Sequence, residues 1–275
     1  MAVSGLPDSL PRAALMGVVN VTPDSFSDGG LFLDAGAAVE HGLRLVEEGT
    51  HLLDVGGEST RPGAEPVSAD EELARVLPVV ERLAAESGVP VSIDTTKAAV
   101  AERALAAGAT MVNDVTALRF DPDMAGVVAA ADAALCLMHM QGTPRTMQDD
   151  PRYDDVVAEI VEFLGERVAV ATGAGVSEQR ICVDPGIGFG KTVAHNLRLI
   201  RELDAFCVLG RPIVVGVSRK RFLGSLTGRD ETERVAATVA ANVAAFERGG
   251  RIFRVHDVAP NRDALTIAEA IEGAA

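Results

Sequence analysis

Eight short apolar runs of this 275-residue sequence each end in polar residues that could bind or act on a ligand. These residues are Asn20, Asp54, Asp94, Asn113 with Asp114, His139, Asp184, Ser218 with Lys220, and Arg254 with His256. Asp, Asn and Ser in such places can simply cap the next helix, and for Asp94 and Asp114 this alternative stays open. A cation before a helix opposes its dipole, so capping does not explain Lys220 or Arg254. The mixture predicts a ligand with an anion at one end and hydrogen-bond donors at the other.

The apolar runs alternate with longer segments of helical period. We expect strands at residues 15–21, 51–55, 90–93, 110–113, 134–138, 180–183, 212–215 and 251–255. Helices are expected near residues 34–48, 69–87, 96–107, 121–131, 154–173, 193–203, 231–248 and 261–272. The runs are continuously apolar, as in parallel strands buried on both faces, and they repeat about every 33 residues, as βαβ units do.

This pattern predicts a single α/β domain over residues 1–275, a (β/α)8 TIM barrel with its core at about 14–272. A doubly wound open sheet is the alternative. In a barrel the carboxyl ends of all strands meet on one face, so the polar residues would surround one mouth. Residues 22–33 and 56–68 are long connections rich in Gly, Pro and Ser, which indicates binding loops or lids.

The segment 69–87 shows how a helix should pack on this barrel. An apolar stripe would face inward and the polar neighbours would face water. The stripe consists of Val76, Val79, Val80 and Leu83, and the polar set consists of Glu72, Arg75, Glu81 and Arg82.

The glycine run DPGIGFGKT, residues 184–192, resembles a phosphate-binding loop only superficially. Pro185 stands where the first glycine of a nucleotide P-loop belongs, and a dinucleotide fingerprint would need a different third glycine. Three alternating glycines after a strand would let the backbone approach a flat ligand, or form a tight turn alone. The run GVSRK, residues 216–220, precedes a helix start at Arg221 that would suit a carboxylate or phosphate, although such triplets are often solvated surface.

Composition excludes several classes of function. The net charge of −15 disfavours nucleic-acid and membrane-surface partners. Three separated cysteines and the absence of a signal-like or bilayer-spanning segment predict a cytoplasmic protein. No triad or nucleophile elbow indicates acyl transfer.

Metal sites are weakly indicated. His41, His51 and His195 lack ligand spacing and are expected to be structural or exposed, whereas His139 and His256 end strands and are better candidates. No cluster resembles a zinc site. A loosely held Mg2+ that takes one ligand from Asn20 and the rest from substrate phosphate oxygens is compatible with the sequence.

The motifs resemble those of the dihydropteroate synthase family. They are NVTPDSFSDGG (20–30), DVGGESTRPG (54–63), SIDT (92–95), NDV (113–115), LMHMQG (137–142), DPGIGFGK (184–191), GVSRK (216–220) and RVHDV (254–258). They occur in order from residue 16 to residue 258, at the ends of all eight expected strands.

The resemblance implies a TIM-barrel enzyme of folate biosynthesis. It would join 6-hydroxymethyl-7,8-dihydropterin diphosphate to p-aminobenzoate and release pyrophosphate and 7,8-dihydropteroate. By similarity, the pterin would be held by Asp94, Asn113, Asp184 and Lys220, with Met138 and Phe189 flanking the ring and Gly216 beside it. Asn20, Arg254 and His256 would receive the diphosphate, with Mg2+ bridging Asn20 and the phosphate oxygens.

The resemblance also implies that the two long loops act as lids over p-aminobenzoate. They would bring in Phe26, Asp28, Thr60, Arg61 and Pro62, while Ser218 binds the benzoate carboxylate. The expected catalytic set is Asp28, Arg61, Lys220, Arg254 and His256, with Asp28 favouring the charge that develops on the pterin. Relatives imply a homodimer and competition by sulfonamides, which mimic p-aminobenzoate.

Two other functions remain open at this stage. A methyltetrahydrofolate–corrinoid methyltransferase would keep the Asp and Asn contacts but would not need the set of Arg61, Arg254 and His256. A non-catalytic paralogue would bind pterin without turnover.

Overall fold

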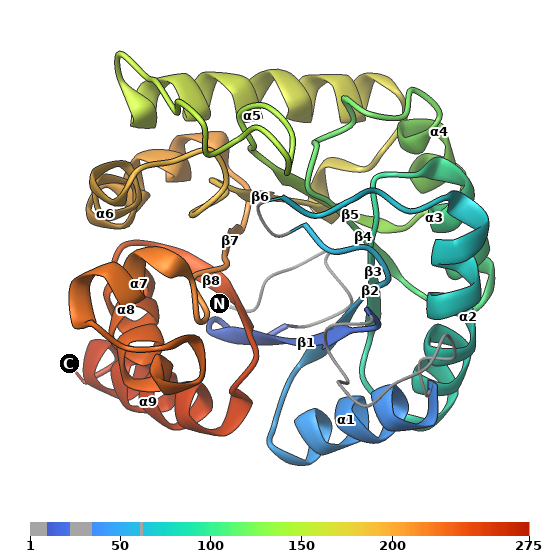
Figure 1. Cartoon of the computed structure of the whole chain (residues 1–275), viewed down its shortest axis with the longest axis horizontal. Coiled ribbons are helices and arrows are strands. Elements are labelled where there is room, and N and C mark those ends of the chain that lie inside the picture. Colours follow the sequence, from blue (N-terminus) through green and yellow to red (C-terminus); the bar gives the residue numbers. More distant parts are fainter. Residues whose placement is uncertain (1–9, 23–34, 61–62, 275) are drawn as a thin grey trace.

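The chain forms a closed barrel of eight parallel strands surrounded by helices. A computed structural model describes residues 10–22, 35–60 and 63–274. The strands follow one another around the barrel in chain order, so that β1 pairs with both β2 and β8 (Figure 1). This confirms the expected (β/α)8 architecture and excludes the open sheet.

The strands occupy the apolar runs. They are β1 (Ala14–Asn20), β2 (Leu52–Gly56), β3 (Val91–Asp94), β4 (Met111–Asp114), β5 (Ala134–Met138), β6 (Ile181–Asp184), β7 (Ile213–Val215) and β8 (Gly250–Val255). Each lies within two residues of its predicted position at either end, because buried parallel strands must be apolar throughout.

The helices form the outer ring in Figure 1. They are α1 (Ala35–Glu47), α2 (Ala69–Glu86), α3 (Ala98–Ala106), α4 (Met124–Ala130), α5 (Val156–Gly173), α6 (Val193–Arg201), α7 (Arg221–Thr227), α8 (Val235–Phe246) and α9 (Val258–Glu272). Short 3-10 helices lie at η2 (Glu178–Arg180), η3 (Leu203–Leu209) and η4 (Glu231–Glu233). The expected helix 231–248 is therefore divided into η4 and α8, and α7 is a further full helix where only a helix start was indicated.

The core has two layers. One apolar cluster consists mainly of strand residues and mixes small with large side chains: Leu10, Ala14, Met16, Leu52, Met111, Ala134, Cys136, Cys182, Val214 and Ile252. A larger apolar layer lies between strands and helices, and it includes the predicted stripe of α2, whose four side chains are fully buried. No helix in the described ranges is long and apolar enough to cross a membrane.

One polar residue of α2 contradicts the prediction. Glu72 was expected to face water, but its side chain is fully buried and its Oε2 lies 2.6 Å from Nζ of Lys97. Lys97, just before α3, also pairs with Glu58 after β2. Burial lowers the pKa of Lys97, but its hydrogen bonds to Glu58 and Glu72 outweigh that effect and raise it. Periodicity within one helix could not reveal a cation supplied by the next.

The Glu72–Lys97 pair should contribute strongly to stability. Lys97→Met would leave the buried Glu72 carboxylate without its cation and should lower the free energy of unfolding by about 3 kcal/mol, measured by urea denaturation at pH 7. Arg82→Met provides the matched control on the same helix, because the Arg82–Glu86 pair is exposed and should leave the midpoint unchanged. Equal midpoints for the two variants would contradict this account of Glu72.

Candidate functional site

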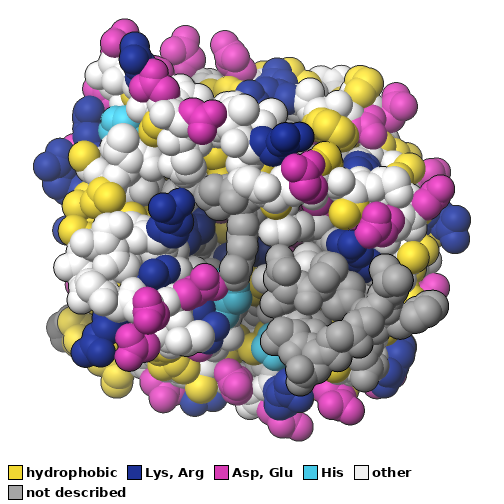
Figure 2. All heavy atoms as spheres, in the orientation of Figure 1, with side chains coloured by type: hydrophobic (Ala, Val, Ile, Leu, Met, Phe, Trp, Pro, Cys, Tyr) yellow, Lys and Arg dark blue, Asp and Glu magenta, His cyan; other side chains and the backbone are white. Residues whose placement is uncertain are grey.

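The carboxyl ends of the strands surround a cavity of about 700 Å3, with an adjoining hollow of about 60 Å3. Together they are lined by every predicted site residue that the structure describes: Asn20, Thr60, Asp94, Asn113, Met138, Asp184, Phe189, Gly216, Ser218, Lys220, Arg254 and His256. Phe26, Asp28, Arg61 and Pro62 lie outside the described residues. Lys, Arg and His side chains are visible near the middle of this face, whose periphery carries many Asp and Glu side chains (Figure 2).

Strand register explains why distant residues meet here. Asp94 is the register partner of Gly56 on one side and of Asn113 on the other, and Met138 is the partner of Asp184. Register partners on parallel strands point to the same side of the sheet, here into the barrel. The last inward residues of β3, β4 and β6 are therefore the polar Asp94, Asn113 and Asp184, and that of β5 is the apolar Met138.

Arg254 is held between two carboxylates. Its Nε donates to Oδ2 of Asp54 at 2.6 Å and its Nη2 donates to Oδ2 of Asp94 at 2.9 Å. Asn113 Nδ2 donates to the same Asp54 oxygen at 3.1 Å. Burial raises the pKa of the Asp94 carboxyl against the opposing attraction of Arg254. The sequence predicted Asp54 at the mouth of the barrel but assigned it no role, and the structure gives it one as the partner of Arg254 and Asn113.

Asp184 and Lys220 form the second charged group of the site. Asp184 is buried, and its Oδ1 accepts a hydrogen bond from Gly186 N at 2.7 Å. Lys220 Nζ donates to the carbonyl of Ile187 and lies 4.4 Å from the centre of the Phe189 ring. Burial lowers the pKa of Lys220 to about 8, although Asp184 raises it, and Arg254 lowers it further.

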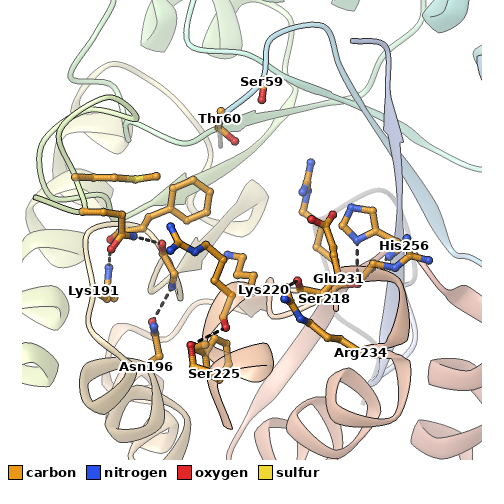
Figure 3. Close-up of a pocket in the computed structure, with 18 of the residues that line it drawn as sticks. Ser59, Thr60, Lys191, Asn196, Ser218, Lys220, Ser225, Glu231, Arg234 and His256 are labelled. Atoms are coloured by element: carbon orange, nitrogen blue, oxygen red, sulfur yellow. Dashed lines mark hydrogen bonds between the residues drawn. The ribbon is translucent and has the colours of Figure 1, made fainter. Parts of the chain in front are cut away.

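Ser218 and His256 connect the loops that follow β7 and β8. Ser218 Oγ accepts a hydrogen bond from His256 N at 3.1 Å and lies 2.9 Å from His256 Nδ1 (Figure 3). Between Ser218 and Lys220, Arg219 has a φ of +57° and pairs through two nitrogens with Asp257, at 2.9 and 2.5 Å. A non-glycine residue in the left-handed region is uncommon, so these contacts hold a costly backbone turn that places Ser218 and Lys220 in the cavity.

The glycines of residues 186–190 fit both sequence interpretations, a tight turn and a surface of bare backbone. Gly186, Gly188 and Gly190 have φ values of +68°, +88° and +64°. A Cβ on Gly186 would lie 1.8 Å from the carbonyl oxygen of His139, and one on Gly190 would lie 2.8 Å from that of Gln141. The loop therefore packs directly on the backbone that follows β5, with Phe189 at the cavity.

The histidines and Asp114 serve the fold in ways that the sequence only partly indicated. His51 Nδ1 accepts a hydrogen bond from Leu15 N at 3.0 Å, and His195 belongs to the capping box of α6. Asp114 accepts hydrogen bonds from the backbone of Thr116 and Leu118, so it stabilises the turn after β4 and does not cap the next helix, α4, which begins at Met124.

His139, proposed as the better metal candidate, is instead buried beside an amine. Its Nδ1 lies 3.0 Å from Nζ of Lys191, a residue that sequence reasoning missed. Burial lowers the pKa of His139 to about 2, with Lys191 and Arg119 acting in the same direction. Within residues 10–22, 35–60 and 63–274, no group of three His, Cys, Asp or Glu side chains could hold a metal ion.

Comparisons with known proteins match this geometry. Residues 16–256 match the family model described as pterin binding enzyme. The chain belongs to the pterin-binding enzyme family. Among curated relatives, it is 47% identical to the dihydropteroate synthase of Neisseria meningitidis serogroup C over 95% of this chain and 94% of that protein.

Solved structures of pterin-binding enzymes have the same fold. A Xanthomonas albilineans dihydropteroate synthase with 4-aminobenzoic acid matches with a TM-score of 0.91 and 52% identity, over 97% of this chain and 96% of that one. The Yersinia pestis dihydropteroate synthase with a sulfonamide drug complex matches with a TM-score of 0.94 and 42% identity, over 100% of both chains.

The close approach at Gly186 gives a test of the site's backbone. Gly186→Ala should lower the free energy of unfolding by about 3 kcal/mol or more, since the new Cβ meets backbone and the φ is strained. Gly210→Ala is the matched control: it has a φ of +63° but nothing within 4 Å of the added Cβ, and should cost only about 1 kcal/mol. If thermal and urea unfolding showed equal losses for both, the contact with His139 would not constrain the loop.

Proposed function

We propose that this chain is a dihydropteroate synthase, which joins 6-hydroxymethyl-7,8-dihydropterin diphosphate to p-aminobenzoate and releases pyrophosphate and 7,8-dihydropteroate. The observation that carries the proposal is one cavity in which buried Asp184 and Asn113 stand close to the cations Lys220 and Arg254. Hydrogen-bond acceptors suit the pterin edge and cations suit the diphosphate. The names of the relatives and of the matched structures agree with this reaction.

Asp184 is the principal partner of the pterin. The aminopyrimidinone edge offers two neighbouring N–H donors, which one carboxylate accepts in a bidentate pair. Since Gly186 N already orients this carboxylate through Oδ1, its direction is fixed before the ligand arrives. Asp94 and Asn113 continue the polar edge, and Met138, Phe189 and the backbone of Gly216 surround the flat ring.

The diphosphate lies toward Asn20, Arg254 and His256. Arg254 also pairs with Asp54 and Asp94, so it meets the diphosphate as a cation that is already partly neutralised. For a Mg2+ ion, Asn20 would supply one amide oxygen and substrate phosphates the rest, a ligand set that suits this cation. The ion would supply positive charge to the leaving diphosphate.

The reaction requires a stabilised leaving group rather than a strong base. Loss of pyrophosphate leaves a cationic methylene on the electron-rich pterin, and the weakly basic aniline then attacks it and sheds a proton. Carbon–oxygen cleavage runs ahead of attack, with Asp28 favouring the developing charge. Lys220, Arg254 and His256 contribute positive charge where negative charge grows, and closure of the two loops excludes water.

Ser218 binds the carboxylate of p-aminobenzoate, with Thr60 at the stem of the second loop. The motif resemblance assigns Phe26, Arg61 and Pro62 to p-aminobenzoate and Arg61 to catalysis, and these three residues lie outside the described part of the chain. Sulfonamides compete with p-aminobenzoate here, in line with the drug complex of the Yersinia relative. The protein acts as a cytoplasmic homodimer.

One assay tests the function directly. Purified protein with both substrates and Mg2+ should form dihydropteroate, detected by mass spectrometry, and removal of Mg2+ by EDTA should depress turnover sharply. Pterin binding without product would indicate a non-catalytic paralogue, and an unchanged rate in EDTA would show that the reaction does not need the metal.

Asp184→Asn should lose at least about tenfold in affinity for the pterin diphosphate, because the bidentate acceptor is lost.

Lys220 predicts a pH dependence. Because its folded pKa lies at about 8, the side chain is charged below that pH and neutral above it. Affinity for the pterin diphosphate, measured by calorimetry, should therefore fall as the pH rises above about 8. The Lys220→Arg variant keeps its charge and should not show this decline at alkaline pH. Because the substrate titrates in the same way with both proteins, the comparison also corrects for titration of the substrate. A decline of equal size in both proteins would assign it to another group.

A further inference from the structure

The loop of residues 186–190 has a hydrogen-bond donor on each of its five carbonyl oxygens. Gly186 O accepts from Phe189 N within the loop at 3.0 Å. The other four accept from side chains outside it: Ile187 O from Lys220, Gly188 O from Gln148 at 2.7 Å, Phe189 O from Lys191 at 2.9 Å, and Gly190 O from Tyr153 at 2.9 Å. Such complete satisfaction fixes the orientation of every peptide in the loop.

Lys191 holds the peptide that carries the Phe189 ring. Phe189 stands between Gly188 and Gly190, both in the left-handed region, which a residue with a Cβ adopts only at a cost. The donor to the Phe189 carbonyl is the Lys191 amine, on a side chain that is only 3% exposed, and burial lowers the pKa of this amine well below its ordinary value (Figure 3). The direction of the Phe189 ring therefore depends on this contact.

The surroundings of Lys191 leave its amine few alternatives. Its second partner is His139 Nδ1 at 3.0 Å, and it lies 5.9 Å from the centre of the Tyr153 ring. The His139 ring in turn packs edge-on against Phe163, at 4.9 Å between centres. These neighbours restrict the Lys191 amine to a position from which it donates to the Phe189 carbonyl. The amine therefore supports this part of the loop rigidly.

We propose that Lys191 is a positioning residue for pterin binding. By holding the Phe189 carbonyl it keeps the Phe189 ring as a fixed platform for the flat pterin, and although Lys191 is one of the residues that line the larger cavity, its effect on pterin affinity acts through that ring. The inference rests on the proposed function only in taking a pterin as the ring that meets Phe189.

A double-mutant cycle tests the inference. Lys191→Met keeps the chain length and removes both hydrogen bonds. In calorimetry with 6-hydroxymethyl-7,8-dihydropterin diphosphate it should weaken binding by about fivefold, the loss expected for an ordinary buried hydrogen bond. The KM for p-aminobenzoate should change less than about twofold. In a Phe189→Ala background the same substitution should have no further effect on pterin affinity, because the group through which it acts is absent.

Controls separate positioning from general stability. Leu164→Ala removes a buried side chain of α5, outside the residues that line the cavity, and should lower the unfolding temperature without changing pterin affinity. If Lys191→Met does not fold, Tyr153→Phe removes the neighbouring donor to Gly190 O and should weaken pterin binding by a smaller factor, again only while Phe189 is present.

Two outcomes would overturn the inference: unchanged pterin affinity in Lys191→Met, or equal losses with and without the Phe189 ring. If only Tyr153→Phe can be measured, the same two results for that variant overturn it. Wild-type turnover is measured separately, so that a protein that binds pterin without forming dihydropteroate would count against the proposed function and leave this inference standing.

Discussion

The mouth of the barrel depends on neutralising a partly buried guanidinium, that of Arg254. Arg254 could not remain at this depth without Asp54 and Asp94, whose carboxylates take two of its nitrogens. The arrangement serves both parts of the site. Asp94, which pairs with Arg254, also lines the hollow proposed for the pterin. Asn113, which donates to Asp54, extends the network to the next strand. The charges of the site are thus set by contacts among strand ends before any ligand binds.

Much of the fold and of the site could be predicted because the barrel converts sequence position into spatial position. Asp94, Asn113 and Asp184 were found because each ends an apolar run, and strand ends meet on one face. The motif resemblance added roles that periodicity alone does not give. The roles themselves are proposals that rest on the placement of these side chains around one cavity.

The errors have a common physical origin in contacts between elements. Glu72 has the sequence environment of an exposed helix residue, and only the approach of Lys97 from the next βα unit allows it to be buried. Lys191 follows a glycine run and looks like a surface lysine, whereas the loop folds back so that its amine meets His139 and the Phe189 carbonyl. The partners Lys97 and His139 are distant in the sequence from Glu72 and Lys191, so local sequence patterns cannot reveal them. Only the start of helix α7, at Arg221, could be predicted, because its seven residues, RFLGSLT, are too short for a clear period.

The ion pair between Arg219 and Asp257 has an evolutionary consequence. It ties the turn that carries Ser218 and Lys220 to the turn that carries His256, and the Ser218–His256 hydrogen bond ties them a second time. The two turns follow different strands, yet neither can shift alone. A substitution selected in one substrate pocket, such as one that escapes an inhibitor, would therefore disturb the other pocket as well. Tolerated substitutions should concentrate in parts of the mouth that the Arg219–Asp257 and Ser218–His256 contacts do not connect.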